Sequence, residues 1–187
     1  DARGAKFRVC PSCGYAYIAD RRNPTKPHKN AYGKECSGKF LTRVALGHEF
    51  LGDIARIRFE RCTRRDWGFW YSLLYAMIEG ACEALDIDRM EIDGCVQWGD
   101  AAGHPAYLVL FDSVSGGVGH VQQLGHEDAL RDTLATAYAK MASCTCGDDE
   151  ANGSCYSCLR NYTNQFCHDF LNRGLVIRFL RELGLEG

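Results

Sequence analysis

The stretch CTCGDDEANGSCYSCLRNYTNQFC, residues 144–167, gathers five cysteines in one short segment and decides how the chain is interpreted. Its first four cysteines follow the spacing C-x-C-x8-C-x2-C, with a polar, glycine-bearing insert between the two pairs. Tetrahedral Zn²⁺ prefers four soft ligands, and two close pairs supply them. Two disulfides or unlinked core thiols are the alternatives. The sequence therefore predicts a structural zinc site, formed by Cys144, Cys146, Cys155 and Cys158.

The segment from Cys155 to His168 is expected to form a helix and to contain one further cysteine. A helix is expected to begin near Cys155, where its positive N-terminal end would favour thiolates. Cys167 would lie on that helix, on roughly the face opposite to Cys158. Four ligands already complete the tetrahedron, so Cys167 is interpreted as a packing residue. His168 is an alternative ligand.

A second cluster lies near the start of the chain, where Cys10-Pro-Ser-Cys13-Gly14 has the form of a zinc-ribbon knuckle. The glycine supplies the backbone freedom that such a turn needs. A second C-x2-C pair does not follow at ribbon spacing, but a histidine and a further cysteine do. The sequence predicts a Cys₃His zinc site, formed by Cys10, Cys13, His28 and Cys36. Cys62 and His48 are the alternatives to His28.

Charge is distributed unevenly along the chain. Residues 1–43 hold ten Lys or Arg against three acidic residues, a net charge of +7, whereas the remainder of the chain carries −9. Phosphate contacts depend on Lys and Arg, so a nucleic-acid contact is expected in this basic head. A solvated basic loop is the alternative. The expected contacts lie in a proline-bearing loop beside His28: Arg21, Arg22, Lys26 and Lys29.

Length and composition limit the class of protein. A chain of 187 residues with 46% hydrophobic content can bury a core without disulfides. It contains no apolar run long enough to span a membrane. It opens with DARGAKFRVCPSC, which lacks the apolar core of a signal peptide. Because it starts with Asp, we expect a fragment of a longer protein. Without a secretory signal, the expected compartment is the reducing cytoplasm.

The order of expected elements predicts an α/β (α+β) fold, with a mixed sheet flanked by helices. Strands are expected within residues 7–18, 40–50, 52–62, 89–98 and 106–113, the last of them central. Helices are expected at 66–86 with Asp66 as N-cap, at about 118–142 with a break near Gly125, and at about 170–183. We expect a basic zinc-ribbon-like module at 1–43, followed by an α/β domain at 44–187 that contains the Cys₄ site.

Catalytic motifs are weak in this chain. The spacings of a zinc deaminase, a zincin and a P-loop are missing, and paired C-x2-C clusters favour closed metal sites over thiol redox chemistry. SGGVGH, residues 115–120, follows a buried strand and has the form of a phosphate-binding turn or of a tight strand-to-helix turn. A hydrolase or nuclease centred on this turn and on the GHEF segment is the alternative function. Its candidate residues are His48, Glu49, Asp53, Asp112 and His120.

Two segments carry a resemblance to a known family: LVLFDSVSGGVGH at 108–120 and CTCGDDEANGSCYSCLRNYTNQFCHDFLNRG at 144–174. They resemble the C-terminal zinc-binding domain, formerly of unknown function, of mitomycin repair factor A-type DEAD/DEAH-box helicases, which is similar to a domain of DISARM phage-defence proteins. The resemblance covers roughly residues 44–185. It implies that Cys144, Cys146, Cys155 and Cys158 bind the metal, and it implies no catalytic residue.

The resemblance also implies a role. It suggests a non-catalytic, zinc-stabilised module that acts as a scaffold and auxiliary DNA contact beside a helicase, in DNA repair or phage defence. The helicase core would lie elsewhere in the same chain or in a partner chain, because this sequence has no Walker motif. Any ATPase activity would then belong to that core.

Overall fold

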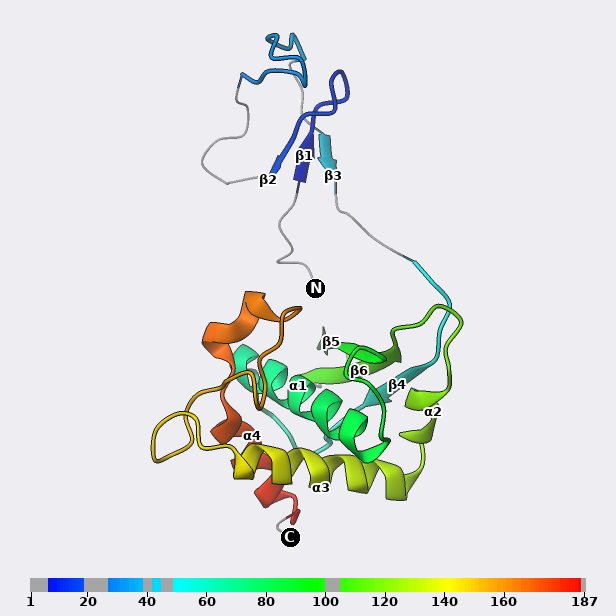
Figure 1. Ribbon diagram of the computed structural model, residues 1–187, viewed down its shortest axis with the longest axis vertical. Coiled ribbons are helices and arrows are strands. Elements are labelled where there is room, and N and C mark those ends of the chain that lie inside the picture. The colour runs from blue at the N-terminus through cyan, green and yellow to red at the C-terminus, as the bar shows by residue number, and fades with distance from the viewer. Residues whose placement is uncertain (1–6, 19–26, 39–41, 45–48, 100–104, 186–187) are drawn as a thin grey trace. The chain divides into compact units, whose positions relative to one another are not determined.

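The structure is a computed structural model, and it describes residues 7–18, 27–38, 42–44, 49–99 and 105–185. The chain forms two compact units, residues 1–49 and 50–187. Each unit has its own sheet and is described separately below (Figure 1). Among the described residues, no helix has the length and apolar character needed to cross a membrane.

The first unit contains a small antiparallel sheet in the strand order β2-β1-β3. Its strands are β1 (Phe7–Val9), β2 (Ala16–Ile18) and β3 (Thr42–Val44). A tight turn joins β1 to β2, in which the Gly14 N–H donates to the Cys10 carbonyl at 2.8 Å. Val44 pairs with Phe7, so residues 42–44 of the strand expected at 40–50 belong to this sheet, whereas Glu49 and Phe50 are not in a strand.

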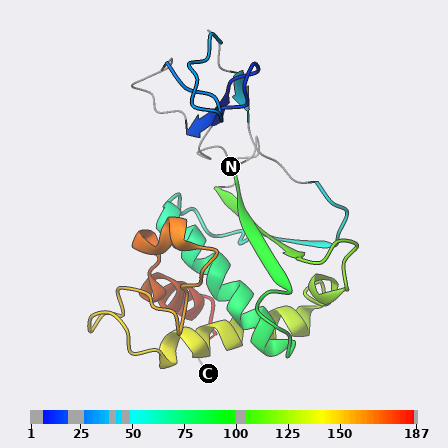
Figure 2. The same ribbon diagram turned by 45° about the horizontal axis from the view of Figure 1, so that its top comes forward.

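The second unit contains an antiparallel sheet in the order β4-β6-β5, with strands β4 (Ile54–Ile57), β5 (Ile92–Trp98) and β6 (Ala106–Asp112). β6 is the central strand, as its continuous apolar run predicted. The helices cover one face of this sheet (Figure 2), and Leu108 and Leu110 are buried in the core. The predicted α+β class is confirmed. The sheet is not mixed as predicted, because every pairing between the described strands is antiparallel.

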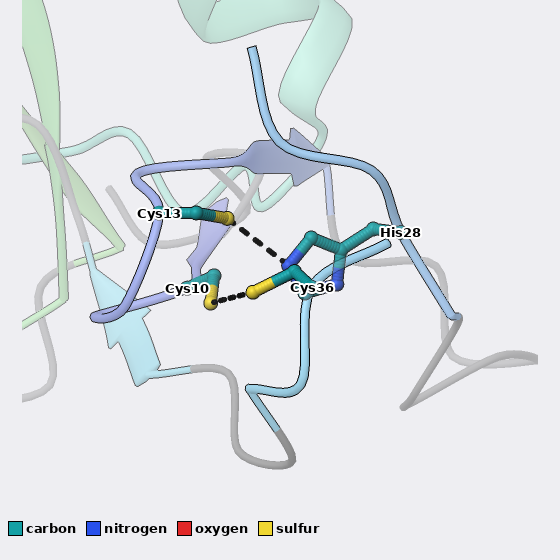
Figure 3. A group of neighbouring side chains, drawn as sticks. All are labelled: Cys10, Cys13, His28 and Cys36. Carbon is teal, nitrogen blue, oxygen red and sulfur yellow. Dashed lines mark hydrogen bonds between the residues drawn. The ribbon is translucent and has the colours of Figure 1, made fainter. Parts of the chain in front are cut away.

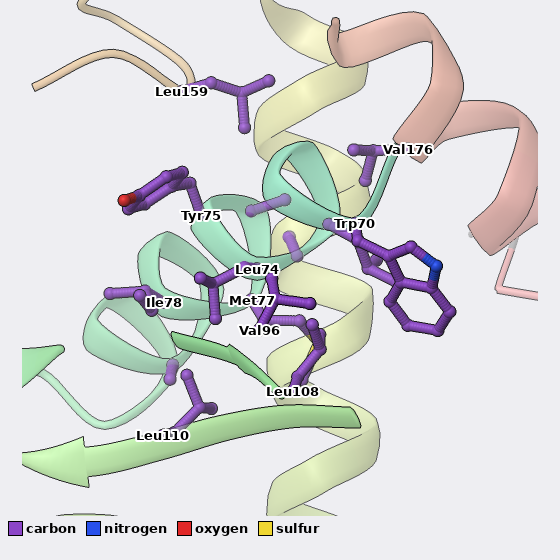
Figure 4. Close-up of a cluster of buried hydrophobic side chains, with 14 of the residues drawn as sticks. Trp70, Leu74, Tyr75, Met77, Ile78, Val96, Leu108, Leu110, Leu159 and Val176 are labelled. Atoms are coloured by element: carbon purple, nitrogen blue, oxygen red, sulfur yellow. The ribbon is translucent and has the colours of Figure 1, made fainter. Parts of the chain in front are cut away.

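Helix α1 (Trp67–Ala84) is the centre of the second unit. Asp66 caps it, as predicted, because its carboxylate accepts the N–H groups of Gly68 and Phe69. The helix lies between the sheet and two further helices, α3 (Glu127–Ser143) and α4 (Arg173–Glu182), so it is buried almost all round. Figure 4 shows the apolar side chains that these elements bury together.

The predicted break near Gly125 is confirmed, since a short helix α2 (His120–Gln123) precedes α3. The prediction of a helix that begins near Cys155 is wrong. Residues 156–159 form a single turn, and the next helical segment is the 3₁₀ helix η1 (Gln165–Phe170). The side chain of Asn161 accepts the N–H groups of Thr163 and Asn164, and such local bonds compete with helix formation.

Candidate metal centres

The first candidate centre brings together the four cysteines of the CTC and CYSC pairs. Cys144 and Cys146 follow the end of α3, and Cys155 and Cys158 lie in the turn before η1. Their four sulfurs lie within 4.8 Å of one another. Single sulfur–sulfur distances are 3.6 Å for Cys144–Cys155, 3.7 Å for Cys146–Cys158 and 3.8 Å for Cys155–Cys158.

These distances fit zinc and do not fit disulfides. A tetrahedron with Zn–S bonds of about 2.3 Å has edges of about 3.8 Å, whereas a disulfide brings two sulfurs to about 2.05 Å. Cys155 is almost equally close to Cys144 and to Cys158, at 3.6 and 3.8 Å, so its sulfur is not paired with a single partner. All eleven cysteines lie in the described part of the chain, and all are free thiols. The geometry therefore supports a closed four-sulfur site.

Backbone groups of the second pair point at the sulfurs. Cys155 donates its N–H to the Cys158 sulfur at 3.2 Å, and Ser157 donates to the Cys155 sulfur at 3.4 Å. Burial raises the pKa of Cys155, but the Ser157 N–H and the neighbouring thiols outweigh this and lower that pKa to about 7. Burial raises the pKa of Cys158. One thiol of the cluster is thus prepared to ionise near neutral pH, and a bound cation would ionise the others.

Arg173 holds the first pair in place, a role that could not be predicted from the ligand spacing. Its side chain is 7% exposed and donates to two carbonyls, that of Cys146 at 2.9 Å and that of Met141 at 3.0 Å. These bonds fix the exit of α3 against the start of α4. A cation in the first turn of a helix opposes the helix dipole, and that unfavourable position was the available signal.

Asn172 and Gly174, on either side of Arg173, hold the insert between the two cysteine pairs against the start of α4. Asn172 caps α4 through the Leu175 N–H and donates to the Asn152 side chain at 3.1 Å. Gly174 must lack a side chain, because a Cβ there would lie 2.8 Å from the Glu150 carbonyl oxygen. The N-R-G run therefore ties residues 144–158 to the helical core.

The second candidate centre lies in the first unit and has three sulfurs and one imidazole (Figure 3). Cys10 and Cys36 have their sulfurs 3.8 Å apart, and the Cys13 sulfur lies 3.2 Å from the His28 Nε2 atom. The four ligand atoms lie within 4.8 Å of one another. This donor set is one that structural zinc uses.

Turns and a β-bridge position the four ligands of this second centre. Cys10 and Cys13 flank the turn after β1, while His28 and Cys36 face each other across a bridge between Lys29 and Glu35. The His28 ring stacks on Tyr15 at a centroid distance of 4.8 Å, which fixes its orientation. Burial raises the pKa of Cys10, but the N–H groups of Ser12 and Cys13 lower it to about 6.

The alternative ligands lie elsewhere. Cys62 is buried in the core of the second unit and is not grouped with Cys10, Cys13, His28 and Cys36. His48 lies outside the described residues. Cys167 is fully buried in the core, and its thiol donates to the Asn164 carbonyl. His168 bonds through Nε2 to the Asn164 side chain at 2.8 Å and is not among the grouped ligands.

The SGGVGH turn is closed by a side chain of its own protein. Asp112 is fully buried and accepts the N–H groups of Val118 at 2.9 Å, Gly119 at 2.8 Å and Val121 at 3.0 Å. Gly119 has φ of 85°, a conformation that glycine adopts without strain. Burial raises the pKa of Asp112, but these three N–H groups hold it below its usual range. The N–H groups that would bind a phosphate are thus already occupied.

The other candidate residues for hydrolysis differ in their contacts, and Asp53 and His120 lie at the SGGVGH turn itself. The His120 Nε2 atom lies 2.6 Å from the Glu91 carboxylate, and Glu49 is exposed. Asp53 lies against Gly117, where a Cβ would be 2.7 Å from the Asp53 Oδ2 atom. Among the predicted basic contacts, Lys29 is exposed, while Arg21, Arg22 and Lys26 lie outside the described residues.

Three comparisons relate the chain to known proteins. Residues 73–159, which include the four-cysteine cluster, match the family described as MrfA Zn-binding domain. The chain is 28% identical over 201 residues to Druantia protein DruE of Escherichia coli (strain UMEA 4076-1), covering 94% of this chain and 10% of that protein. The predicted resemblance to the zinc-binding domain of MrfA-type helicases is confirmed.

A solved structure has a similar fold. The crystal structure of the DUF1998 helicase MrfA bound to DNA matches with a TM-score of 0.53 and 14% identity, over 82% of this chain and 19% of that chain. At this identity the match concerns the fold alone. The chain thus spans 10% of the length of the curated relative and 19% of the solved one.

Proposed function

We propose that this chain, which contains a zinc-binding domain of the MrfA type, is a non-catalytic accessory module of a helicase-type nucleic-acid-processing system. The observation that carries the proposal is the match of residues 73–159 to that domain in a chain that spans 10% and 19% of two much longer proteins. The helicase core and its ATPase activity would lie elsewhere in the same protein or in a partner. The system would act in DNA repair or phage defence, in the cytoplasm.

A scaffold role is supported by the way the cysteine clusters are held. Each set offers four protein donor atoms within 4.8 Å of one another, which would leave no position for a substrate or water on a bound zinc ion. Zn²⁺ would supply folding stability at such sites, and the Arg173 bonds would transmit it to the helical core. The closed SGGVGH turn argues against the hydrolase alternative.

The module is expected to lack hydrolytic activity of its own. We expect the purified 187-residue chain, loaded with zinc, to release no phosphate from ATP and to leave DNA uncut above the background of a mock preparation. The physical reason is that Asp112 occupies the only glycine-rich turn after a buried strand in the described part of the chain. Turnover that survives in the Asp112→Ala and His120→Ala variants would be a contaminant, and turnover lost in both would refute the scaffold assignment.

We further propose that the basic head provides the auxiliary contact to duplex DNA. Residues 1–43 carry +7 and the remainder −9, and Lys29 is exposed beside the His28 ligand. Each neutralised phosphate adds about 0.9 to the salt slope on a duplex. Replacing Arg21, Arg22, Lys26 and Lys29 by Gln should therefore reduce that slope by about 3 to 4 and weaken binding strongly at low salt.

The measurement is fluorescence anisotropy of a labelled duplex at several salt concentrations. Arg131→Gln combined with Arg178→Gln is a control, because both arginines are exposed on the second unit. This control should leave the slope unchanged. An unchanged slope in the head variant would show that the contact lies elsewhere.

A further inference from the structure

Four aromatic rings form a cluster on the surface of the second unit, where the first turn of α1 meets η1. Trp67 lies 4.3 Å from Tyr71, 6.4 Å from Phe166 and 5.5 Å from Phe170, measured between ring centroids. Tyr71 and Phe166 lie 5.6 Å apart. Single exposed apolar side chains are ordinary, but a contiguous exposed group indicates an interaction surface.

The cluster is exposed and yet rigidly supported. Phe166 is 58% exposed and Phe170 is 55% exposed, although each touches Trp67. Between them in the sequence, Cys167 is fully buried in the core and anchors η1. The backbone of α1 also approaches η1 closely, since a Cβ on Gly68 would lie 2.8 Å from the Phe170 carbonyl oxygen. The two exposed rings are therefore held in place before any ligand binds.

Arginines flank the cluster on the chain segment that leads into α1. Arg61 and Arg65 are both exposed, and neither forms an ion pair with another described residue. Arg64, between them, is engaged by Glu182 at 3.5 Å and lies over the Phe69 ring at 4.9 Å. Arg61 also lines a pocket with Glu60 and Glu182, and Arg65 lies two residues before Trp67 in the sequence. These two exposed guanidinium groups thus remain available to an anionic ligand on the segment before α1.

Few carboxylates oppose these arginines. Asp66 directs its two oxygens to the N–H groups of Gly68 and Phe69 at the start of α1. Glu60 pairs with Arg58 at 2.5 Å. Asp169, on η1, is exposed and adds one negative charge to the surface. Residues 61–66 carry Arg61, Arg64 and Arg65 against one acidic residue, Asp66, so the segment that leads into α1 is basic within an otherwise acidic unit.

We propose that this aromatic cluster, with Arg61 and Arg65, is a binding platform for single-stranded nucleic acid. Bases stack on the exposed faces of Phe166 and Phe170, and the arginines neutralise the adjoining phosphates. A duplex keeps its base faces covered, so exposed rings favour a single strand. This inference goes beyond the proposed function, because it places a nucleic-acid surface on the second unit and does not depend on the basic head.

The first test measures stacking. The complete 187-residue chain and its Phe166→Ala/Phe170→Ala variant are titrated into fluorescein-labelled oligodeoxythymidine. Loss of stacking with two bases should weaken binding roughly 10-fold or more. Tyr162→Ala is the matched control, because Tyr162 is 84% exposed and touches no ring among the described residues. Equal affinity of the double variant and the control would overturn the proposal, and would leave a protein partner as the occupant.

The second test measures how much Arg61 and Arg65 contribute to the salt dependence of binding. In Arg61→Gln/Arg65→Gln the salt slope for the same oligonucleotide should fall by about 1.4, because single strands contribute about 0.7 per phosphate. The Arg131→Gln/Arg178→Gln variant should retain the slope of the parent chain. An unchanged slope in the first variant would contradict the platform. The head variant described above reports on duplex binding, so failure of that contact is distinguishable from failure of this one.

Discussion

The Cys155→Ser variant is expected to lose one of two zinc equivalents and to leave the second unit without a cooperative thermal transition. The Cys155 sulfur lies 3.6 and 3.8 Å from two other cysteine sulfurs, so it occupies a corner of the tetrahedron. A serine hydroxyl is not ionised at neutral pH and is a poor ligand for zinc. Structural zinc contributes about 10–16 kcal/mol, which is comparable to or larger than the typical stability of a domain, about 5–15 kcal/mol.

Elemental analysis and circular dichroism check this result. The parent chain should contain close to two equivalents of zinc, one for each four-ligand cluster. Cys95→Ser is the matched control, because Cys95 is exposed and lies outside both clusters. The control should keep both metals and melt like the parent chain. A Cys155→Ser protein that keeps two metals or melts normally would refute the four-sulfur site.

The Asp112→Ala variant is expected to destabilise the second unit by about 3–5 kcal/mol. The substitution leaves the N–H groups of Val118, Gly119 and Val121 without their acceptor beneath the SGGVGH turn. Hydrogen bonds to a charged group contribute more than neutral ones, and buried donors left unpaired are unfavourable. The turn would then no longer be fixed between β6 and α2.

Urea denaturation at pH 7 measures the effect. Asp93→Ala is the control, since Asp93 is on the same sheet but, among the described residues, its side chain accepts the N–H of Gly94 alone. It should change the free energy of unfolding by less than about 1 kcal/mol. The folded-state pKa of Asp112 is lowered, so its contribution is complete above the ordinary carboxyl pKa and declines as the pH falls through the lowered value. Equal stability of the two variants would show that the carboxylate does not close the turn.

Local features of this fold were predictable from the sequence because they depend on neighbouring residues. The cap at Asp66 and the break at Gly125 follow from residue type and short-range hydrogen bonds. The grouping of Cys144 with Cys155 followed from ligand spacing, since a metal site restricts which cysteines can be used. The α+β class followed from the order of these elements.

Features that depend on contacts between distant segments were not predictable. The buried guanidinium of Arg173 bonds to carbonyls 27 and 32 residues earlier in the chain. Trp67 meets Phe170 only because η1 folds over the start of α1. The turn after Cys155 was mistaken for a helix start because Asn161 and Asn164 bond locally and end it.

Helix α1 is synthesised well before the segment that packs against it. The Asn172 N–H donates to the Ser72 hydroxyl at 2.8 Å, across 100 residues of sequence, and α4 covers a face of α1 just beyond it. Ribosomes extend a chain by about 5–20 residues each second. For several seconds, therefore, α1 is outside the ribosome while α4, which packs against it, is not yet synthesised. During this interval the nascent unit exposes apolar surface that a chaperone would recognise.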